Sequence, residues 1–315
     1  RQTACECSFF PVVAVQPEMV RAQMPAPFRG GLVGRCLQKD AGPSCRVDGP
    51  VNCRQLSVSV VMPCFNAAET VSRALRAVAS QSLPPVEVVA VDDGSTDDTR
   101  VVLETAATES WPFRLKTLWH HSNRGVADAR NAALAAIDGD ISYVAFLDAD
   151  DWWLPEKLKR QIDWMEDHPD ISWTAHRCVV GDPDPKHDRS HGPPLATRIS
   201  VRRLLFRNPI ATATVVVRRP VPSAFRSGWR HCEDLMAWID WLNAGCKAAM
   251  IEQTLACLGR LPASRGGLCG NHSAMYGGEL EIINQLERSR VLGTLEAAGW
   301  RAHAWLRHNR RGLCR

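Results

Sequence analysis

Long apolar runs are missing from this 315-residue sequence. No window approaches the ~20 consecutive apolar residues that a membrane-spanning helix needs. An ordinary signal peptide is also missing, because the apolar stretch Phe9 to Val15 is short and no basic run precedes it. The twelve cysteines show no paired C-x₂-C pattern of a zinc site, and their spacing requires no disulfide framework. A reducing cytoplasm is therefore the expected location.

Several motifs of nucleotide-binding and hydrolytic enzymes are missing as well. No G-x-G-x-x-G follows the first expected strand, and no G-x-x-x-x-G-K-[ST] occurs anywhere, so the sequence supports neither a dinucleotide oxidoreductase nor a phosphate-loop NTPase. It contains no H-E-x-x-H and no G-x-S-x-G, the motifs of zinc peptidases and serine hydrolases. Any chemistry must therefore come from another set of residues.

Positive charge is scarce in the middle of the chain and concentrated at its ends. The formal net charge is +4, yet residues 57–300 hold 26 basic and 30 acidic side chains, whereas residues 301–315 hold five Arg and no acid. A nucleic-acid-binding protein carries its positive charge on the folded part, so nucleic acid is not an expected partner. The basic C-terminus is either a solvated tail or a peripheral contact with the anionic inner face of a membrane.

Three segments are expected from composition and periodicity. Residues 1–55 have no sustained periodicity and many Pro and Gly, so this segment is expected to be disordered or poorly ordered. Residues 56–262 are expected to form the main domain. Residues 263–315 would hold a glycine-rich loop, one long amphipathic helix from Glu279 to Ala298, and the basic tail.

Strands and helices alternate through the first half of the main domain, which predicts an α/β fold with a doubly wound sheet. Ligands of such sheets bind outside the carboxyl ends of the strands. Helices are expected to begin near Asn66 and near Ser95 or Thr96, which are good N-cap residues. The expected strands are 58–62, 86–91, 115–119 and 141–147, and the expected helices are 66–80, 96–107 and 127–137.

Three carboxylates, Asp148, Asp150 and Asp151, follow the apolar run 141–147. If the strand continues to Asp150, its period of two places Asp148 and Asp150 on one face. Two carboxylates on one face repel each other unless a cation or proton lies between them. Mg²⁺ prefers one or two carboxylates together with substrate phosphates. The alternative is that these aspartates cap the following helix.

Polar clusters at Pro63 to Asn66 and at Asp92 to Asp98 follow two other expected strands. Three polar clusters at one sheet edge favour a nucleotide and metal site over simple caps. On this interpretation Asp148 and Asp150 belong to the site, and Asp151 caps the helix behind them.

Glu233 and Asp234 precede an apolar helical stripe that runs to Leu242. Carboxylates are stabilised at a helix N-terminus, which is one explanation for them. The helix dipole also keeps a carboxylate ionised, which suits a general base. From this segment alone the pair is therefore either a helix-stabilising feature or a catalytic one.

Taken together and in order, these motifs resemble family 2 glycosyltransferases, which are inverting enzymes with the GT-A fold. The resemblance covers roughly residues 56 to 290 and implies a single Rossmann-like mixed sheet with a C-terminal helical extension. It rests on Val58 to Asn66, Gln81-Ser82, Val91 to Thr99, Asn123-Arg124-Gly125, Ala129-Arg130-Asn131, Phe146 to Asp151 and Glu233-Asp234.

The resemblance implies a role for residues on the donor side. Pro63 and Phe65 would line the base and ribose pocket, where the family more often has Tyr in place of Phe65. Asp93 would hydrogen-bond the base edge, and Arg130 would lie near the diphosphate.

It also implies roles at the metal and the acceptor. Asp148 would face the ribose or metal-bound water, and Asp150 would ligate Mg²⁺ or Mn²⁺. Asp234 would be the catalytic base, with Glu233 beside it to orient the acceptor.

The implied function is inverting transfer of a sugar from a nucleotide-diphosphate sugar, expected to be a UDP-sugar, to a hydroxyl of a saccharide or lipid-linked saccharide. Cell-surface polysaccharide or lipopolysaccharide synthesis is the expected setting. A sugar nucleotidyltransferase is an alternative, although no Gly-rich, Lys/Arg-bearing loop follows the first strand. A non-catalytic nucleotide-binding protein is another, although the acidic motifs are intact.

Overall fold

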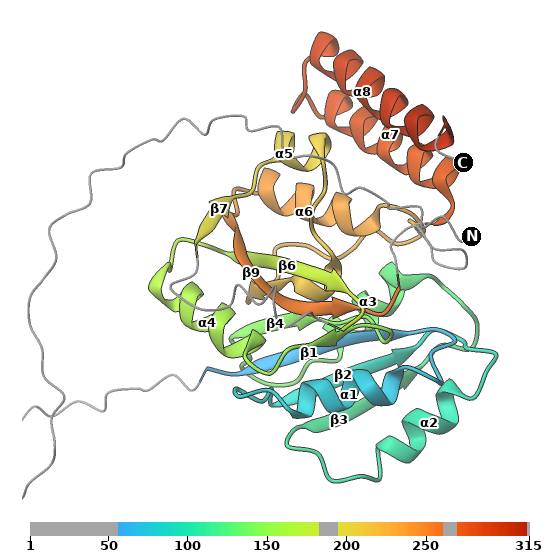
Figure 1. Ribbon diagram of the computed structural model, residues 1–315, viewed down its shortest axis with the longest axis vertical. Helices are drawn as coiled ribbons and strands as arrows, with labels where there is room; N and C mark the ends of the chain where they lie inside the picture. Colours follow the sequence, from blue (N-terminus) through green and yellow to red (C-terminus); the bar gives the residue numbers. More distant parts are fainter. Residues whose placement is uncertain (1–55, 183–194, 261–269, 314–315) are drawn as a thin grey trace, which may run out of the picture. The chain divides into compact units, whose positions relative to one another are not determined.

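The computed structural model describes residues 56–182, 195–260 and 270–313 (Figure 1). The expectations for residues 1–55 and for most of the glycine-rich loop fall outside these residues. Within them, none of the helices combines the length and the apolar character needed to cross a membrane.

The main domain contains alternating strands and helices in the order expected. The first half comprises β1 (Val58–Cys64), α1 (Val71–Ala79), β2 (Glu87–Asp92), α2 (Thr99–Ala106), β3 (Arg114–Trp119), α3 (Val126–Ala135), β4 (Tyr143–Phe146), β5 (Trp152–Trp153) and α4 (Lys157–Asp167). The second half comprises β6 (Trp173–Val180), β7 (Ala196–Arg198), α5 (Val201–Phe206), the 3-10 turn η2 (Thr212–Thr214), β8 (Val216–Arg218), α6 (Glu233–Asn243) and β9 (Ala248–Leu258). The C-terminal segment adds α7 (His272–Arg288) and α8 (Thr294–Leu313).

The strands form one mixed sheet with the order β3-β2-β1-β4-β8-β6-β9-β5, and β7 pairs with β9. Strands β3, β2, β1 and β4 are parallel, whereas β8 runs antiparallel to both β4 and β6. Cys64, the last residue of β1, lies beside Asp92, the last residue of β2. The polar segments after β1, β2 and β4 therefore meet at one edge of the sheet, as expected for a doubly wound fold.

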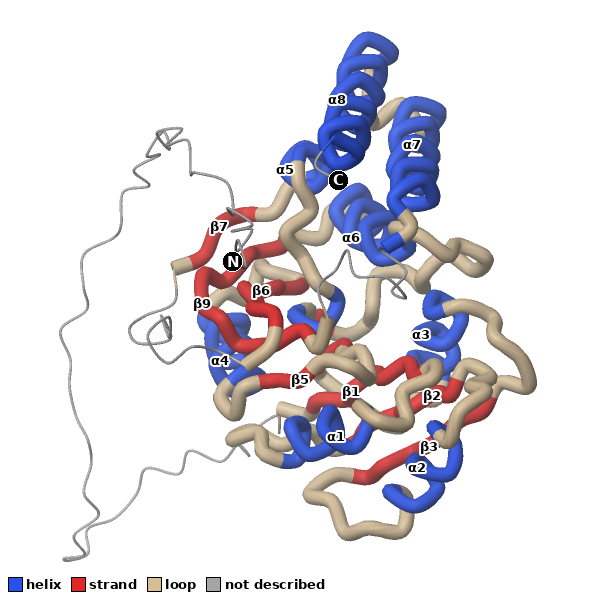
Figure 2. Tube along the Cα trace, turned by 45° about the vertical axis from the view of Figure 1, so that its right-hand side comes forward, coloured by secondary structure: helices blue, strands red, loops and turns tan. Residues whose placement is uncertain are grey.

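Both faces of the sheet are buried, which explains why its strands are continuous apolar runs. Val58, Val60 and Met62 of β1 belong to the core under α1, α2 and α4, whereas Val61 belongs to the core under α3 and α6. Helices α6, α7 and α8 lie on the opposite side of the sheet from α1 and α2 (Figure 2).

Aromatic side chains fasten α6 to the sheet. Trp238 and Trp241 of α6 are fully buried. The ring centroid of Trp238 lies 6.1 Å from that of Phe146 on β4 and 5.4 Å from that of Trp173 on β6. Aromatic pairs at such distances stabilise a core beyond the area that they bury. The N-terminus of α6 is thereby held in a fixed relation to the end of β4.

The expected cap residues of the first two helices have other roles. Helix α1 begins at Val71 rather than near Asn66, and Asn66 has φ +49°. The Asn66 side-chain oxygen accepts a hydrogen bond from the Thr96 amide at 2.8 Å, and Ser95 donates to Asp92. These side chains tie the loops after β1 and β2 together, so the cap predictions were wrong.

The single helix expected from Glu279 to Ala298 is also wrong, because the chain turns between α7 and α8. Arg290 has φ +60°, and the amides of Val291 and Leu292 both donate to the Leu286 carbonyl. The buried Leu292 side chain anchors this turn, and α8 packs back along α7 (Figure 1).

Candidate active site

The D-x-D segment lies in a turn at the carboxyl end of β4. The strand ends at Phe146, and the Asp151 amide donates to the Asp148 carbonyl at 3.0 Å, so the condition that would place Asp148 and Asp150 on one face of a strand is not met. The side chains of Asp148 and Asp150 are 30% and 34% exposed and accessible from the sheet edge. Burial, followed by repulsion from Asp148, raises the pKa of Asp150 above its usual value.

Asp151 does not cap the next helix, contrary to expectation. The short strand β5 follows it, and α4 begins only at Lys157. The Asp151 carboxylate instead accepts a hydrogen bond from the Gly259 amide at 3.0 Å, which joins the D-x-D turn to the end of β9. Burial and the neighbouring aspartates raise the pKa of Asp151 to about 8.

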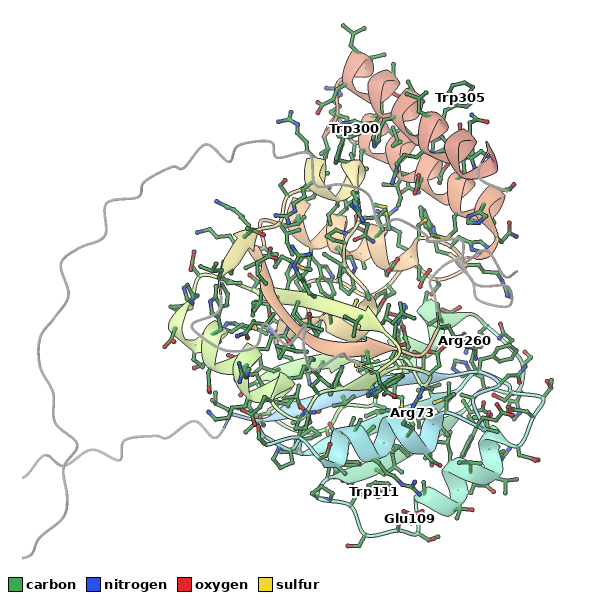
Figure 3. All side chains as sticks on the ribbon, in the orientation of Figure 1. Arg73, Glu109, Trp111, Arg260, Trp300 and Trp305 are labelled. Atoms are coloured by element: carbon green, nitrogen blue, oxygen red, sulfur yellow. The ribbon has the colours of Figure 1, made fainter. Side chains whose placement is uncertain are left out.

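Two arginines that the sequence motifs did not indicate lie against this turn (Figure 3). Arg73 of α1 donates to the Asp150 carbonyl at 3.0 Å, with its guanidinium 3.7 Å from the centre of the Trp152 ring. The Arg260 guanidinium lies 3.3 Å from the Asp150 carboxylate. Neither arginine belongs to a periodic or capping pattern, so nothing in the sequence assigns it to the site.

Arg130 of α3 connects the D-x-D turn to the acidic pair of α6. One Nη donates to Asp148 at 2.8 Å, and the other donates to Glu233 at 2.9 Å. The guanidinium side chain is 3% exposed. Burial alone disfavours its charge, but the two carboxylates outweigh this effect and raise the pKa of Arg130. Arg130 is thus a permanent buried cation between two acidic groups.

Glu233 and Asp234 form the first turn of α6, after Cys232 at φ +59°. Burial and the neighbouring Asp234 raise the pKa of Glu233 to about 7, against the opposing effect of Arg130. Asp234 retains some exposed surface, and its carboxylate lies 3.5 Å from the Thr212 hydroxyl. Burial also raises the pKa of Asp234, which makes it a better proton acceptor than an exposed aspartate.

Asp93 organises the loops beside the site. Its carboxylate accepts hydrogen bonds from the amides of Gly125 at 2.8 Å and Arg124 at 3.0 Å, and it lies 2.7 Å from His120 Nδ1. Gly94, at φ +71°, sits so close to the next loop that a Cβ would lie 2.6 Å from the Ser122 carbonyl carbon. The predicted contact of Asp93 with a nucleotide base stays a prediction.

Pro63 and Phe65 lie at the end of β1, next to this loop. Pro63 is buried within the strand, whereas the Phe65 side chain is 48% exposed. An exposed ring at a strand end is available to stack on a planar ligand.

The carboxylates at the sheet edge fit a hard divalent cation. Among the described residues, no three His, Cys, Asp or Glu side chains gather closely enough to hold a metal by themselves. Asp148 and Asp150 are oxygen donors whose mutual repulsion raises the pKa of Asp150. One or two carboxylates completed by substrate phosphates is the arrangement that Mg²⁺ favours, so the pair suits such an ion.

The site therefore combines groups from the ends of β1, β2 and β4 with Arg130 of α3 and the acidic pair of α6. A direct contact network joins three of the predicted residues, Asp148, Arg130 and Glu233, with Asp150 and Asp234 next to them in the chain. Asp93, Pro63 and Phe65 border this network on the β1 and β2 side. Such an arrangement can bind a phosphorylated ligand, hold a cation and accept a proton.

A family model described as "Glycosyl transferase family 2" matches residues 59–222. TuaG of Bacillus subtilis (strain 168), named provisionally as a teichuronic acid biosynthesis glycosyltransferase, is 32% identical over 201 residues, covering 63% of this chain and 77% of TuaG. The Escherichia coli enzyme WfgD, a UDP-Glc:alpha-D-GlcNAc-diphosphoundecaprenol beta-1,3-glucosyltransferase, is 32% identical over 187 residues, which cover 59% of this chain and 70% of WfgD.

Among solved structures, S. aureus TarS 1-349 in complex with UDP-GlcNAc superposes with a TM-score of 0.60. The similarity covers 80% of this chain and 72% of the TarS chain at 20% sequence identity. At this level of identity the likeness concerns the fold.

Proposed function

We propose, from the premise that this chain belongs to glycosyltransferase family 2 and has its GT-A fold, that it moves a sugar from a UDP-sugar to an acceptor hydroxyl with inversion at the anomeric carbon. The buried bridge of Arg130 between Asp148 and Glu233 carries this proposal. It couples the donor side of the site to the acidic pair that would act on the acceptor. Because α3 supplies the bridge, both halves of the reaction share one rigid support.

The proposed donor site lies at the ends of β1, β2 and β4. Phe65 stacks on the base, and Pro63 shapes the floor of the pocket. Asp93 lies beside the base and fixes the loop at Arg124 and Gly125 by hydrogen bonds. The names of relatives support a uridine nucleotide, since WfgD uses UDP-Glc and TarS was solved with UDP-GlcNAc.

Asp148 and Asp150 would hold Mg²⁺ or Mn²⁺ together with the donor diphosphate. When bound, the ion stabilises the negative charge that grows on the departing diphosphate. Arg130 contributes a fixed positive charge 2.8 Å from the Asp148 carboxylate and orients it by a hydrogen bond.

Asp234 accepts the proton of the attacking hydroxyl as the new glycosidic bond forms. The bond between the anomeric carbon and the diphosphate oxygen breaks in the same displacement, and its electron pair leaves with the diphosphate. Glu233 orients the acceptor while Arg130 fixes its carboxylate. A single displacement requires no covalent enzyme intermediate and inverts the anomeric configuration.

The proposed acceptor is a saccharide, in particular a lipid-linked one used for cell-surface polysaccharide or lipopolysaccharide. WfgD, by its name, acts on a GlcNAc-diphosphoundecaprenol. The basic residues Arg310, Arg311 and Arg315 near the C-terminus suit peripheral contact with the membrane that holds such an acceptor.

A panel of nucleotide sugars tests the proposal, with binding followed by calorimetry with and without Mn²⁺ and transfer followed by release of the nucleoside diphosphate. We expect a UDP-sugar to bind more tightly with Mn²⁺ and to be turned over, and Asp150→Ala to abolish the effect of the metal. Asp163→Ala, at an exposed ion pair on α4, is the control and should behave as the wild type. The proposed function would be contradicted if UDP-sugars bound equally well with and without Mn²⁺ and were not turned over.

A further inference from the structure

The outer face of α8 is apolar. Between Thr294 and Asn309, every exposed residue of α8 is uncharged, whereas the charged residues are partly buried. Leu295 is 91% exposed, Trp305 55% and Leu306 48%. Figure 3 shows Trp305 on the side of α8 that faces away from Trp300. The outer face comprises Leu295, Ala298, Gly299, Ala302, Trp305 and Leu306.

The charged side chains of this part of α8 are only 27–34% exposed and are held by ion pairs with neighbouring helices. Glu296 pairs with Arg202 of α5 at 2.8 Å, Arg307 pairs with Glu279 of α7 at 2.8 Å, and Arg301 pairs with Glu287 of α7. A helix on the surface of a globular protein normally shows its charges to water and its apolar stripe to the core. Helix α8 uses its charges to hold neighbouring helices, which leaves the apolar stripe outside.

The positive charge of residues 294–315 indicates which kind of partner covers the apolar outer face of α8. After Glu296 the sequence has no further acid, and Arg310, Arg311 and Arg315 follow at the C-terminal end. A helix that lies in a membrane interface combines an exposed apolar face, Trp near the headgroups and basic residues that attract anionic lipid. Glu287 and Glu279 of the same chain neutralise Arg301 and Arg307, but a second copy would still bring three further arginines, Arg310, Arg311 and Arg315, and no acid beside them, so like charge opposes that occupant.

We propose that α8 lies flat on an anionic membrane surface, with Leu295, Trp305 and Leu306 inserted among the headgroups. The inference rests on the proposed function, because a lipid-linked acceptor is presented at such a surface. It goes further by assigning the contact to one helix face instead of the basic tail alone.

Sedimentation with vesicles tests the proposal, with the 315-residue chain and vesicles of phosphatidylglycerol and phosphatidylcholine or of phosphatidylcholine alone. We expect binding to the anionic vesicles that weakens with added salt. The double variant Leu295→Glu, Leu306→Glu should lower the partition coefficient at least about tenfold, because two inserted side chains become charged. The matched control Val86→Glu, Val101→Glu adds the same charges at exposed positions remote from α8 and should lower it far less.

Binding of the α8 variant as strong as that of the wild type would overturn the proposal, as would equal loss in both double variants. Sedimentation velocity without vesicles tests whether a second copy of the chain covers this face. We expect a monomer, whereas a wild-type dimer that the α8 variant dissociates would make the face a subunit interface and overturn the proposal. UDP binding, measured by calorimetry on the same samples, separates the two proposals. Its absence in the wild type refutes the proposed function, whereas normal UDP binding without vesicle binding refutes only the membrane contact.

Discussion

At the scale of single residues, the account depends on a buried arginine between two carboxylates. Arg130 is held by Asp148 and Glu233, and its Nε has no partner among the described residues. A buried ion pair adds little stability compared with an apolar replacement, but loss of one partner leaves buried charges uncompensated. We therefore interpret Arg130 as a residue kept for positioning and for charge in the site.

Replacement of Arg130 by Gln removes the charge and leaves a shorter, neutral side chain that cannot reach both carboxylates. We expect the free energy of unfolding to fall by roughly 3–5 kcal/mol and kcat/KM to fall at least about 100-fold, measured by urea unfolding and steady-state kinetics. Arg100→Gln, which breaks an exposed pair with Glu104, should change neither quantity appreciably. Similar effects of the two substitutions would contradict the role of Arg130.

Glu233 should give the protein a pH-dependent stability. Burial and Asp234 raise its pKa in the folded state to about 7 from an ordinary value of 4.5. The folded state thus binds a proton that the unfolded state has lost. The stabilising contribution is complete below about pH 4.5 and disappears as the pH rises through about 7.

In the variant Glu233→Gln, the side chain at position 233 no longer titrates. Between pH 5 and pH 8, the unfolding free energy of the wild type should therefore fall relative to that of Glu233→Gln, by on the order of 1–3 kcal/mol. Urea unfolding at four or five pH values measures this difference. Parallel profiles for the two proteins would show that Glu233 is not perturbed.

The polar strand end and the family resemblance together named Asp148, Arg130 and Glu233 as site residues, and the structure brings these three side chains into contact, while their roles stay predictions. Arg73 and Arg260 were not predictable, because their contacts with the D-x-D turn depend on tertiary packing of α1 and on the end of β9. The interpretation of Asp151 as a cap failed for a similar reason. A local rule assigned it to the next helix, whereas Gly259, distant in sequence, binds it.

At the scale of elements, α7 supports the turn that carries the acidic pair. Gly278 of α7 lies so close to this turn that a Cβ would be 2.9 Å from the His231 carbonyl oxygen and 3.1 Å from Cys232 Sγ. Cys232 also lies 3.5 Å from the Met275 carbonyl oxygen. The close approach fixes the backbone immediately before Glu233.

Gly278→Ala should therefore displace α7 or the turn. We expect kcat to fall about tenfold or more while KM for the donor stays near the wild-type value, because the donor side of the site is not touched. Gly277→Ala is the matched control, since a Cβ there meets nothing within 4 Å. It should leave kcat unchanged and raise the unfolding free energy by about 0.5–1 kcal/mol, the usual gain from Ala in a helix. Equal kcat values for the two variants would contradict the role of α7.

The sequence predicted that helices follow β1 and β2, but it did not predict the residues at which they begin. Asn66 and Ser95 are ordinary cap residues by type, but in the structure they bind across to the neighbouring loop. The turn between α7 and α8 was missed because apolar residues recur at helical spacing on both sides of it, with Leu286 and Leu292 both buried. Only the backbone at Arg290, at φ +60°, breaks the pattern.

At the scale of the whole molecule, the alternation of apolar strands and helices was sufficient to predict the α/β fold. Two cores, one on each face of the sheet, account for strands without polar alternation. The exposed face of α8 was hidden from the sequence, because an amphipathic pattern does not state which of its faces turns inward. The ion pairs of Glu296 and Arg307 with neighbouring helices decide that question in the structure.

The most direct test of the central claim is the transfer rate of Asp234→Asn. The substitution is isosteric and replaces the carboxylate by a neutral amide that cannot accept the proton. We expect donor binding, measured by calorimetry, to stay within about threefold of the wild type while transfer to the acceptor falls at least about 100-fold. Transfer at the wild-type rate would contradict the account, because the proton of the acceptor would then have to leave by another route.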